Sequence, residues 1–550
     1  MSEQSTPRIP RRSFKESYQK IDKESSRLIH FISSGIKKVF TPTVLFFLIL
    51  ILGVFARVWK FNQVPPGLHQ DEASIGLEAY DLLHFGVDRN GNSFPVNFTS
   101  WGDGMDALYG YVLIPFMTMG LTPFTTRLPI LLSSLLTLPL VYFIAKKTLG
   151  QSFALLSMLL LAISPWHIMM SRWGINENIL PLVFVLGYAC LLRSSAKNYW
   201  FVISAFFFAL CIYAYGAMYV AIPAFLFCAI PVLIWSKRLS IRSLLAGLAV
   251  FLILVTPIFL FILVNAFGWD SLHLGVFTIP RLPVQARFLN VSPISQSNPI
   301  LTVAKNIWAM LRLLFITQSD GNVFNTLDPY GYLYAFSFPL AIVGAVLLFP
   351  TRREKPSPEK LLLLVWLFAA ICIGLVQPVN INRIHLIFIP IILYTAACLE
   401  WLGKQKKVVL VFLVGIYLFS FVSFTKDYYA KPYLEKATAA FYADLVPALD
   451  YANQAGNQPI CITNRVNSPY IFALFSAKLN PADYLGSIRY IYPEQKSGLV
   501  ASVDRYTIGI ASCANDPATI YVLSTEKPPD NGIIYTVKDF ILYHVYVPQP

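Results

Sequence analysis

PPGLHQDE, spanning Pro65–Glu72, follows directly on an apolar segment that begins near Thr43. It places two adjacent carboxylates, Asp71 and Glu72, where a membrane helix is expected to emerge into water. The Pro-Pro-Gly sequence is typical of a turn, and we expect Asp71 to cap a helix that runs to about Phe85. The chain is therefore predicted to present acidic groups at a membrane surface directly after its first crossing.

Polar residues recur along one side of this expected helix. They fall at positions i, i+3, i+7 and i+10, which are Asp71, Ser74, Glu78 and Asp81. An apolar stripe lies beside them, so we expect the helix to lie in the membrane interface with its acids facing a cavity. The alternative is that these acids only solvate a surface helix.

The composition predicts a polytopic α-helical membrane protein. Of 550 residues, 56% are hydrophobic and only 13% are charged, whereas soluble proteins carry roughly 25% charged residues. Many apolar runs are about 20 residues long, enough for a helix to cross a bilayer. The net charge of +14 does not indicate a nucleic-acid partner, because lysines and arginines cluster in short loops between these runs, as in cytoplasmic loops.

About eleven runs are predicted to span the membrane. They lie at 43–61, 128–145, 152–170, 177–193, 199–214, 216–235, 241–266, 331–349, 359–376, 382–402 and 406–425. The piece at 106–121 is short and contains proline, so it is predicted to be interfacial or re-entrant.

The basic loops set the expected sidedness in a multi-pass protein of the cell (plasma) membrane. A basic tail at 1–42 and loops such as Lys146-Lys147 should be cytoplasmic. The transmembrane domain at 43–425 then carries two long loops on the outer side. These are 62–127 and 267–330, the second with an amphipathic helix near 300–315.

The last part of the chain, 426–550, differs from the rest. Expected helices alternate with short β-rich runs, which predicts a small extracytoplasmic α/β domain. This region contains Cys461 and Cys513, and the sequence leaves open whether they pair.

Ionisable residues gather on the outer side of the predicted topology. They are Asp71, Glu72, Asp103, Asp106, Arg172, Glu177, Arg383 and His385. Together they suit a lipid-phosphate substrate, because arginine binds a phosphate in a fork and a carboxylate takes a proton from an attacking hydroxyl. The alternatives are lipid-headgroup contact for Arg383 and a local ion pair for Arg172 with Glu177.

Other chemistries find little support in the sequence. No Cys/His spacing indicates a zinc site. No glycine-rich loop of the P-loop or dinucleotide type is present, which argues against nucleotide binding of those kinds. No cofactor is required by the sequence, and whether a divalent metal joins Asp71 is left open.

Four short motifs follow one another along the predicted transmembrane domain. They are Gln70-Asp71-Glu72; Thr126-Arg127-Leu128-Pro129; Ser164-Pro165 followed by Ser171-Arg172 and Glu177; and Asn382-Arg383 followed by Pro390. In their order and sidedness they resemble the GT-C glycosyltransferases of the protein O-mannosyltransferase and 4-amino-4-deoxy-L-arabinose transferase type (glycosyltransferase family 39 type). The similarity covers roughly 43–425 and is densest in 60–235.

The resemblance implies a sugar donor on a polyprenyl phosphate, used on the extracytoplasmic face. Asp71 would match the catalytic acid of the first loop and act as general base, with Glu72 beside it. Glu177 would match a second acid near the acceptor. Arg383, with Arg172, would meet the donor phosphate. The acceptor would be a lipid, a glycan or a protein.

This chain departs from the family pattern in two ways. The aminoarabinose transferase carries a lysine late in the first loop, where this chain has acids, Asp103 and Asp106. A MIR-type domain is also missing, so protein O-mannosylation is not specially indicated. With Glu78 and His385, these acids are predicted to serve the acceptor side or the surrounding loop.

The sequence therefore predicts an inverting glycosyltransferase that depends on a lipid-linked sugar. The main alternative is a polytopic transporter or lipid flippase, which predicts broken helices and polar residues in mid-span. A second alternative is a scaffold whose outer domain binds a partner.

Overall fold

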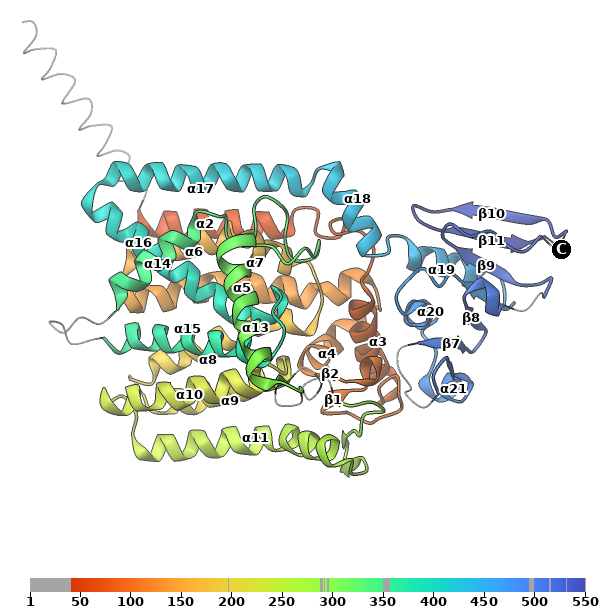
Figure 1. Ribbon diagram of the computed structural model, residues 1–550, viewed down its shortest axis with the longest axis horizontal. Coiled ribbons are helices and arrows are strands. Elements are labelled where there is room, and N and C mark those ends of the chain that lie inside the picture. The colour runs from red at the N-terminus through yellow and green to blue at the C-terminus, as the bar shows by residue number, and fades with distance from the viewer. Residues whose placement is uncertain are drawn as a thin grey trace, which may run out of the picture.

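The computed structural model describes residues 41–195, 197–286, 290, 292–293, 296–349, 357–493, 499–513, 516–530 and 532–549. Nearly all of the basic tail predicted at 1–42 lies outside the described residues. Figure 1 shows a bundle of long helices that run side by side, with a smaller unit containing a sheet beyond one end of the bundle.

Each predicted apolar run overlaps one helix of the bundle. These helices are α2 (Pro42–Val58), α5 (Pro123–Leu149), α6 (Gln151–Ala162), α8 (Leu180–Arg193), α9 (Tyr199–Ala214), α10 (Met218–Trp235), α11 (Ile241–Phe267), α14 (Ser337–Leu348), α15 (Pro358–Val376), α16 (Phe388–Gln405) and α17 (Lys407–Tyr428). Seven helices of the described chain are long and apolar enough to cross a membrane. The chain thus has a polytopic helical membrane fold, and the number of spans stays a prediction.

Several predicted spans are interrupted near the end of the bundle that faces the smaller unit. The run at 152–170 divides into α6 and α7 (Pro165–Met170), because Pro165 has no N–H with which to continue a helix but fits its first turn. Short 3₁₀ turns, η3 (Asn176–Ile179) and η6 (Asn382–Ile387), precede α8 and α16. These interruptions turn polar side chains toward one region.

α13 (Pro299–Arg312) continues into the π-helical turn η5 (Leu313–Thr317). By length and composition the pair is one of the seven helices able to cross a membrane. In Figure 1, however, α13 runs across the direction of the long helices. Met310 is buried while Trp308 is 63% exposed, which fits the amphipathic helix predicted near 300–315.

The two ends of the bundle differ in charge. At one end Lys147 donates to the carbonyl of Leu192, and Arg238 pairs with Glu359 at 2.6 Å. α10 and α15 connect this basic end to the opposite end, which faces the smaller unit. The clustering agrees with the basic loops lying on a single side, and their cytoplasmic location stays a prediction.

In its described residues, the smaller unit has four α-helices and a seven-stranded mixed sheet. The helices are α18 (Lys431–Ala440), α19 (Leu445–Ala455), α20 (Pro469–Ala477) and α21 (Pro481–Tyr484). The sheet order is β10-β11-β9-β5-β8-β7-β6. Its strands are β5 (Ile460–Ile462), β6 (Arg489–Tyr490), β7 (Val500–Val503), β8 (Tyr506–Ile508), β9 (Ile520–Leu523), β10 (Tyr535–Asp539) and β11 (His544–Pro548). β5 is parallel to β8 and β9, and Cys461 and Cys513 form a disulfide.

The first outer loop lies between the bundle and this unit (Figure 1). It contains α3 (Gln70–Phe85), α4 (Leu108–Leu113), the 3₁₀ helix η2 (Ile114–Met119) and the strand pair β1 (Asn97–Phe98) and β2 (Met105–Asp106). A second pair, β3 (Leu272–Leu274) and β4 (Phe277–Ile279), belongs to the other long loop. α20 packs on α3 at Gly76, where an added Cβ would lie 3.3 Å from the Phe475 ring.

Candidate active site

α3 starts two residues earlier than the sequence predicts. Its N-cap is His69, whose ring nitrogen Nδ1 accepts from the Asp71 N–H, while the Glu72 carboxylate accepts from the His69 N–H. This reciprocal arrangement is a capping box. Burial lowers the pKa of His69, which keeps the ring neutral and able to accept. Because His69 caps the helix, Asp71 is released from the capping role predicted for it.

Asp71 lies on the wall of a cavity. Its side chain is 37% exposed, and its Oδ1 accepts a hydrogen bond from the Trp101 indole N–H at 3.1 Å. It is the member of the predicted polar stripe that lines the cavity. The carboxylate is therefore held from one side and open to the cavity on the other.

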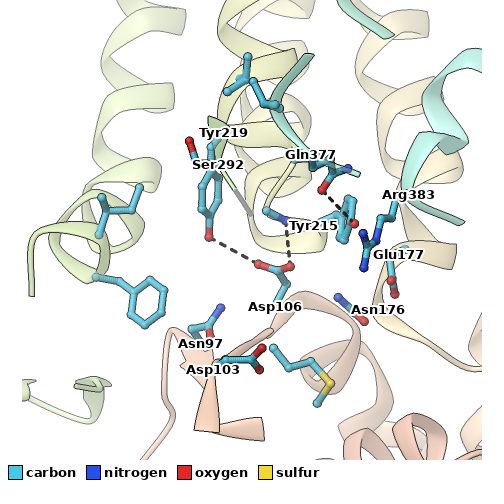
Figure 2. Close-up of a pocket in the computed structure, with 18 of the residues that line it drawn as sticks. Asn97, Asp103, Asp106, Asn176, Glu177, Tyr215, Tyr219, Ser292, Gln377 and Arg383 are labelled. Carbon is cyan, nitrogen blue, oxygen red and sulfur yellow. Dashed lines mark hydrogen bonds between the residues drawn. The ribbon is translucent and has the colours of Figure 1, made fainter. Parts of the chain in front are cut away.

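The cavity has a volume of about 350 Å³. Five of the predicted site residues line it, namely Asp71, Asp103, Asp106, Glu177 and Arg383. Figure 2 shows Asp106, Glu177 and Arg383 around the same space. Residues more than 300 positions apart in the sequence thus meet at one end of the bundle, with four carboxyl groups and one guanidinium on the described part of the wall.

Asp106 is fixed at the break between α9 and α10. Its Oδ2 accepts from the Gly216 backbone N–H at 2.9 Å, and its Oδ1 lies 3.5 Å from the Tyr219 hydroxyl (Figure 2). An added Cβ on Gly216 would lie 3.9 Å from the Asp106 carboxylate, an ordinary van der Waals contact, so this hydrogen bond does not require glycine.

Glu177 and Arg383 lie together on another part of the cavity wall (Figure 2). Asn382, which precedes Arg383, donates to Glu177 Oε1 at 3.1 Å, and its own amide oxygen accepts from Asn325 at 3.3 Å. The Arg383 guanidinium donates to the Pro378 carbonyl at 3.1 Å. An arginine anchored through one N–H keeps others for an anionic group in the cavity.

One side of the cavity is apolar. It is formed by Val220 of α10, Phe261 and Ile262 of α11, and Val376 of α15. A polar chamber next to an apolar wall at the end of a membrane bundle suits a molecule with a charged head and a hydrocarbon body.

Glu72 lies away from the cavity, in contrast to the predicted catalytic role. Its side chain is fully buried and accepts from Arg127 Nε and Nη2, both at 2.7 Å, and from the Gly174 N–H at 2.7 Å. A helix turns by about 100° per residue, so adjacent side chains face different neighbours. Glu72 therefore ties the start of α3 to α5 and to the turn at Gly174.

Arg172 and His385 are also enclosed, in contrast to the roles predicted for them. Arg172 donates to the carbonyls of Val64 at 3.0 Å and Trp59 at 2.6 Å, and to the Tyr429 hydroxyl at 2.6 Å. It is fully buried, so it supports the end of α2 instead of lining the cavity. His385 accepts from the Trp166 indole at 2.9 Å and contacts Asn178 at 2.7 Å.

Glu78, predicted near the acceptor, belongs to a buried acidic group behind α3. Its carboxylate pairs with Arg89 at 3.0 Å, and both side chains are nearly inaccessible. Burial, with Asp88 nearby, raises the pKa of Glu78 to about 8 in spite of Arg89. Burial and Glu78 raise the pKa of Asp81 to about 9. Beyond Asp71, the predicted stripe is thus covered by the loop at 86–104 and by α20, and it does not face the cavity.

Several lining residues were not predicted. They are Asn97, Trp101, Asn176, Tyr215, Tyr219 and Gln377. Tyr215 donates to Gln377 at 3.3 Å (Figure 2). The available signal was the Tyr-Gly pair that separates two apolar runs at 214–216, a position where a helix end turns polar groups inward. Within the described ranges, no three His, Cys, Asp or Glu side chains are grouped so as to hold a metal ion.

The comparisons with known proteins concern the fold. Residues 108–261 match the family model described as dolichyl-phosphate-mannose-protein mannosyltransferase. No curated protein matches the chain. ArnT of Cupriavidus metallidurans bound to undecaprenyl phosphate is similar over 92% of this chain and 97% of that chain, with 13% identity and a TM-score of 0.56.

Two further structures are similar. ArnT in its apo state has a TM-score of 0.53, 14% identity and the same coverage of 92% and 97%. The oligosaccharyltransferase of Archaeoglobus fulgidus, in the apo form, has a TM-score of 0.48 and 13% identity over 80% of this chain and 64% of that chain. The resemblance found in the sequence is confirmed: the chain has the GT-C fold of ArnT, and its residues 108–261 match the protein mannosyltransferase family.

Proposed function

We propose that this chain is an integral membrane glycosyltransferase that moves a sugar from a polyprenyl-phosphate donor to an acceptor hydroxyl on the extracytoplasmic face. The observation that carries the proposal is the shared cavity, in which Asp71 and Arg383 meet next to an apolar wall. ArnT, whose fold the chain shares, was crystallised with undecaprenyl phosphate, which supports a lipid phosphate as the ligand.

The proposed reaction is an in-line displacement with inversion. The acceptor hydroxyl oxygen attacks the anomeric carbon, its proton passes to Asp71, and the bond between that carbon and the phosphate oxygen breaks. The electron pair leaves with the phosphate. Asp71 suits the role of base because its carboxylate is oriented by Trp101 yet open to the cavity.

Arg383 is proposed to hold the phosphate as negative charge develops on it. A guanidinium binds phosphate oxygens through paired N–H groups, and next to an apolar wall this contact is stronger than at a fully solvated surface. Glu177, held by Asn382 on the same wall, would orient the sugar or the acceptor.

Two features support the extracytoplasmic side. The basic residues Lys147 and Arg238 gather at the opposite end of the bundle, as cytoplasmic residues do. The disulfide between Cys461 and Cys513 lies in the unit next to the cavity, and disulfides persist in oxidising compartments.

A transfer assay with labelled polyprenyl-phosphate sugars and membrane extracts as acceptor tests the proposal. Asp71→Asn and Arg383→Gln should lose transfer at least about a hundredfold, since each removes a group that acts on the reacting atoms. Asp270→Asn and Arg281→Gln are matched controls, because these two residues form an exposed pair outside the cavity, and both should retain activity.

If the wild-type protein moves the labelled donor from one leaflet of a vesicle membrane to the other and forms no glycosylated product, the proposal is contradicted in favour of a flippase. Full transfer by Asp71→Asn would remove Asp71 from the mechanism.

A further inference from the structure

Trp101 is the contact through which the first loop holds the candidate base. In the described part of the chain, it is the side chain that donates a hydrogen bond to the Asp71 carboxylate, at 3.1 Å. His69 Nδ1 lies 3.5 Å from Asp71 Oδ2, but this nitrogen accepts from the Asp71 backbone and so has no proton for the carboxylate. The orientation of Asp71 therefore depends on where the indole ring is held.

The backbone at Trp101 is strained. Its φ is 52° and its ψ is 11°, a left-handed conformation that side chains other than glycine, asparagine and aspartate adopt rarely. Trp101 lies in the short 3₁₀ turn η1 (Ser100–Gly102) between β1 and β2. Strain of this kind persists where surrounding contacts fix the residue, and it often occurs at functional sites.

Arg89 supplies the fixing contact. Its guanidinium lies over the Trp101 ring, 5.3 Å from the ring centre, a cation–π geometry. The guanidinium is itself immobile, because its Nε pairs with Glu78 at 3.0 Å and its Nη2 donates to Ser100 at 3.2 Å. Its side chain is 4% exposed, so it does not reach the cavity.

We propose that Arg89 and Trp101 form a positioning pair for Asp71, in which Arg89 fixes the indole ring and the indole N–H aims the Asp71 carboxylate at the acceptor hydroxyl. The inference rests on the proposed function and adds two residues to it. Trp101 contacts the base, and Arg89 acts only through Trp101.

The smaller unit contributes to the same pair. The Tyr484 hydroxyl of α21 donates to the Arg89 backbone carbonyl at 3.1 Å. The loop that carries Arg89 is therefore held between α3 on one side and the α/β unit on the other.

Trp101→Phe tests the pair directly, since it keeps an aromatic ring but removes the N–H. Its kcat should fall by about tenfold or more, as for the loss of one hydrogen bond to a charged group, while KM for the donor changes little. The acidic limb of kcat/KM should move to higher pH, because the ionised base loses a stabilising donor. Trp269→Phe, an exposed tryptophan, is the matched control.

Arg89→Lys keeps the charge and removes the flat guanidinium. It should lower kcat, and in the Trp101→Phe background it should cause no further loss, because both changes remove the same function. If Arg89→Lys does not yield folded protein, Glu78→Gln/Arg89→Gln removes both buried charges together and should show the same non-additivity.

Additive losses in the double variant, or an unchanged acidic limb in Trp101→Phe, would overturn the inference. These outcomes are separable from a failure of the proposed function. If Asp71→Asn is inactive while Trp101→Phe matches the wild type, only the positioning pair is refuted, whereas an active Asp71→Asn refutes the mechanism itself.

Discussion

Glu72→Ala is expected to destabilise the folded chain by about 3–5 kcal/mol, the usual cost of breaking a buried ion pair from one side. The Glu72 carboxylate accepts two hydrogen bonds from Arg127, both at 2.7 Å, and one each from the backbone of His69 at 3.0 Å and Gly174 at 2.7 Å. Its side chain is fully buried, and that of Arg127 is 3% exposed. The variant leaves a buried cation and two backbone donors without this acceptor.

The gross value of these contacts is larger than the expected loss. Hydrogen bonds to charged groups contribute about 1.5–3 kcal/mol each, but Arg127 retains the Pro65 carbonyl at 2.8 Å and the Gly67 carbonyl at 2.9 Å. These acceptors offset part of the cost of leaving the buried Arg127 charge without Glu72. Glu72→Leu/Arg127→Met should therefore be more stable than Glu72→Ala, because it removes the buried charge together with its partner.

Thermal and denaturant unfolding of the purified chain in detergent measures both variants. Lys431→Ala is the control, because it breaks an exposed pair with Glu435 and should not change stability measurably. Glu72→Ala with wild-type stability, or a double variant no more stable than the single one, would refute the structural role given to Glu72.

Three further predictions address other parts of the molecule. Asp81→Asn should stabilise the fold, because burial raises the pKa of the Asp81 carboxyl to about 9, so this group must take up a proton when the chain folds at neutral pH. The gain in stability should be absent below about pH 4 and grow to about 4 kcal/mol at pH 7. Melting curves recorded across this pH range measure it. Asn382→Ala should lower the transfer rate by about tenfold, because it removes the hydrogen bond from Asn382 to Glu177. A lower transfer rate with an unchanged melting temperature would show that the loss is not due to unfolding. Cys461→Ser/Cys513→Ser should lower stability by about 2–4 kcal/mol relative to the untreated wild type, and reductant-treated wild type should unfold like the variant.

Sidedness made most of the candidate site predictable from the sequence. Asp71, Asp103, Asp106, Glu177 and Arg383 were expected together because they lie next to apolar runs that end on the same predicted side, and the structure brings them into one cavity. Charge at membrane depth is costly and so marks function more often than in soluble proteins. The candidate site was therefore predicted more from the positions at which the apolar runs end than from the residue types.

The sequence did not separate lining residues from supporting ones. Asp71 and Glu72 are adjacent and chemically alike, yet one faces the cavity and the other faces Arg127. The choice depends on the rotation of α3, which His69 fixes by capping it. Arg172 matches a family motif but points at the carbonyls that end α2. Periodicity says that such side chains share an element, and tertiary packing decides which partner each one meets.

The α/β unit also helps to fix the position of Asp71, and the local sequence around Asp71 does not reveal this. At the start of the loop, the Leu68 N–H donates to the Phe441 carbonyl at 2.7 Å. Gly67 has a φ of +75°, and a Cβ there would lie 2.2 Å from the same carbonyl, so only glycine allows this approach. Phe441 also lies under Arg127, 5.4 Å from its guanidinium. The turn before Asp71 is thus held between Arg127 and a segment nearly 400 residues later, so the α/β unit helps to fix the position of the candidate base.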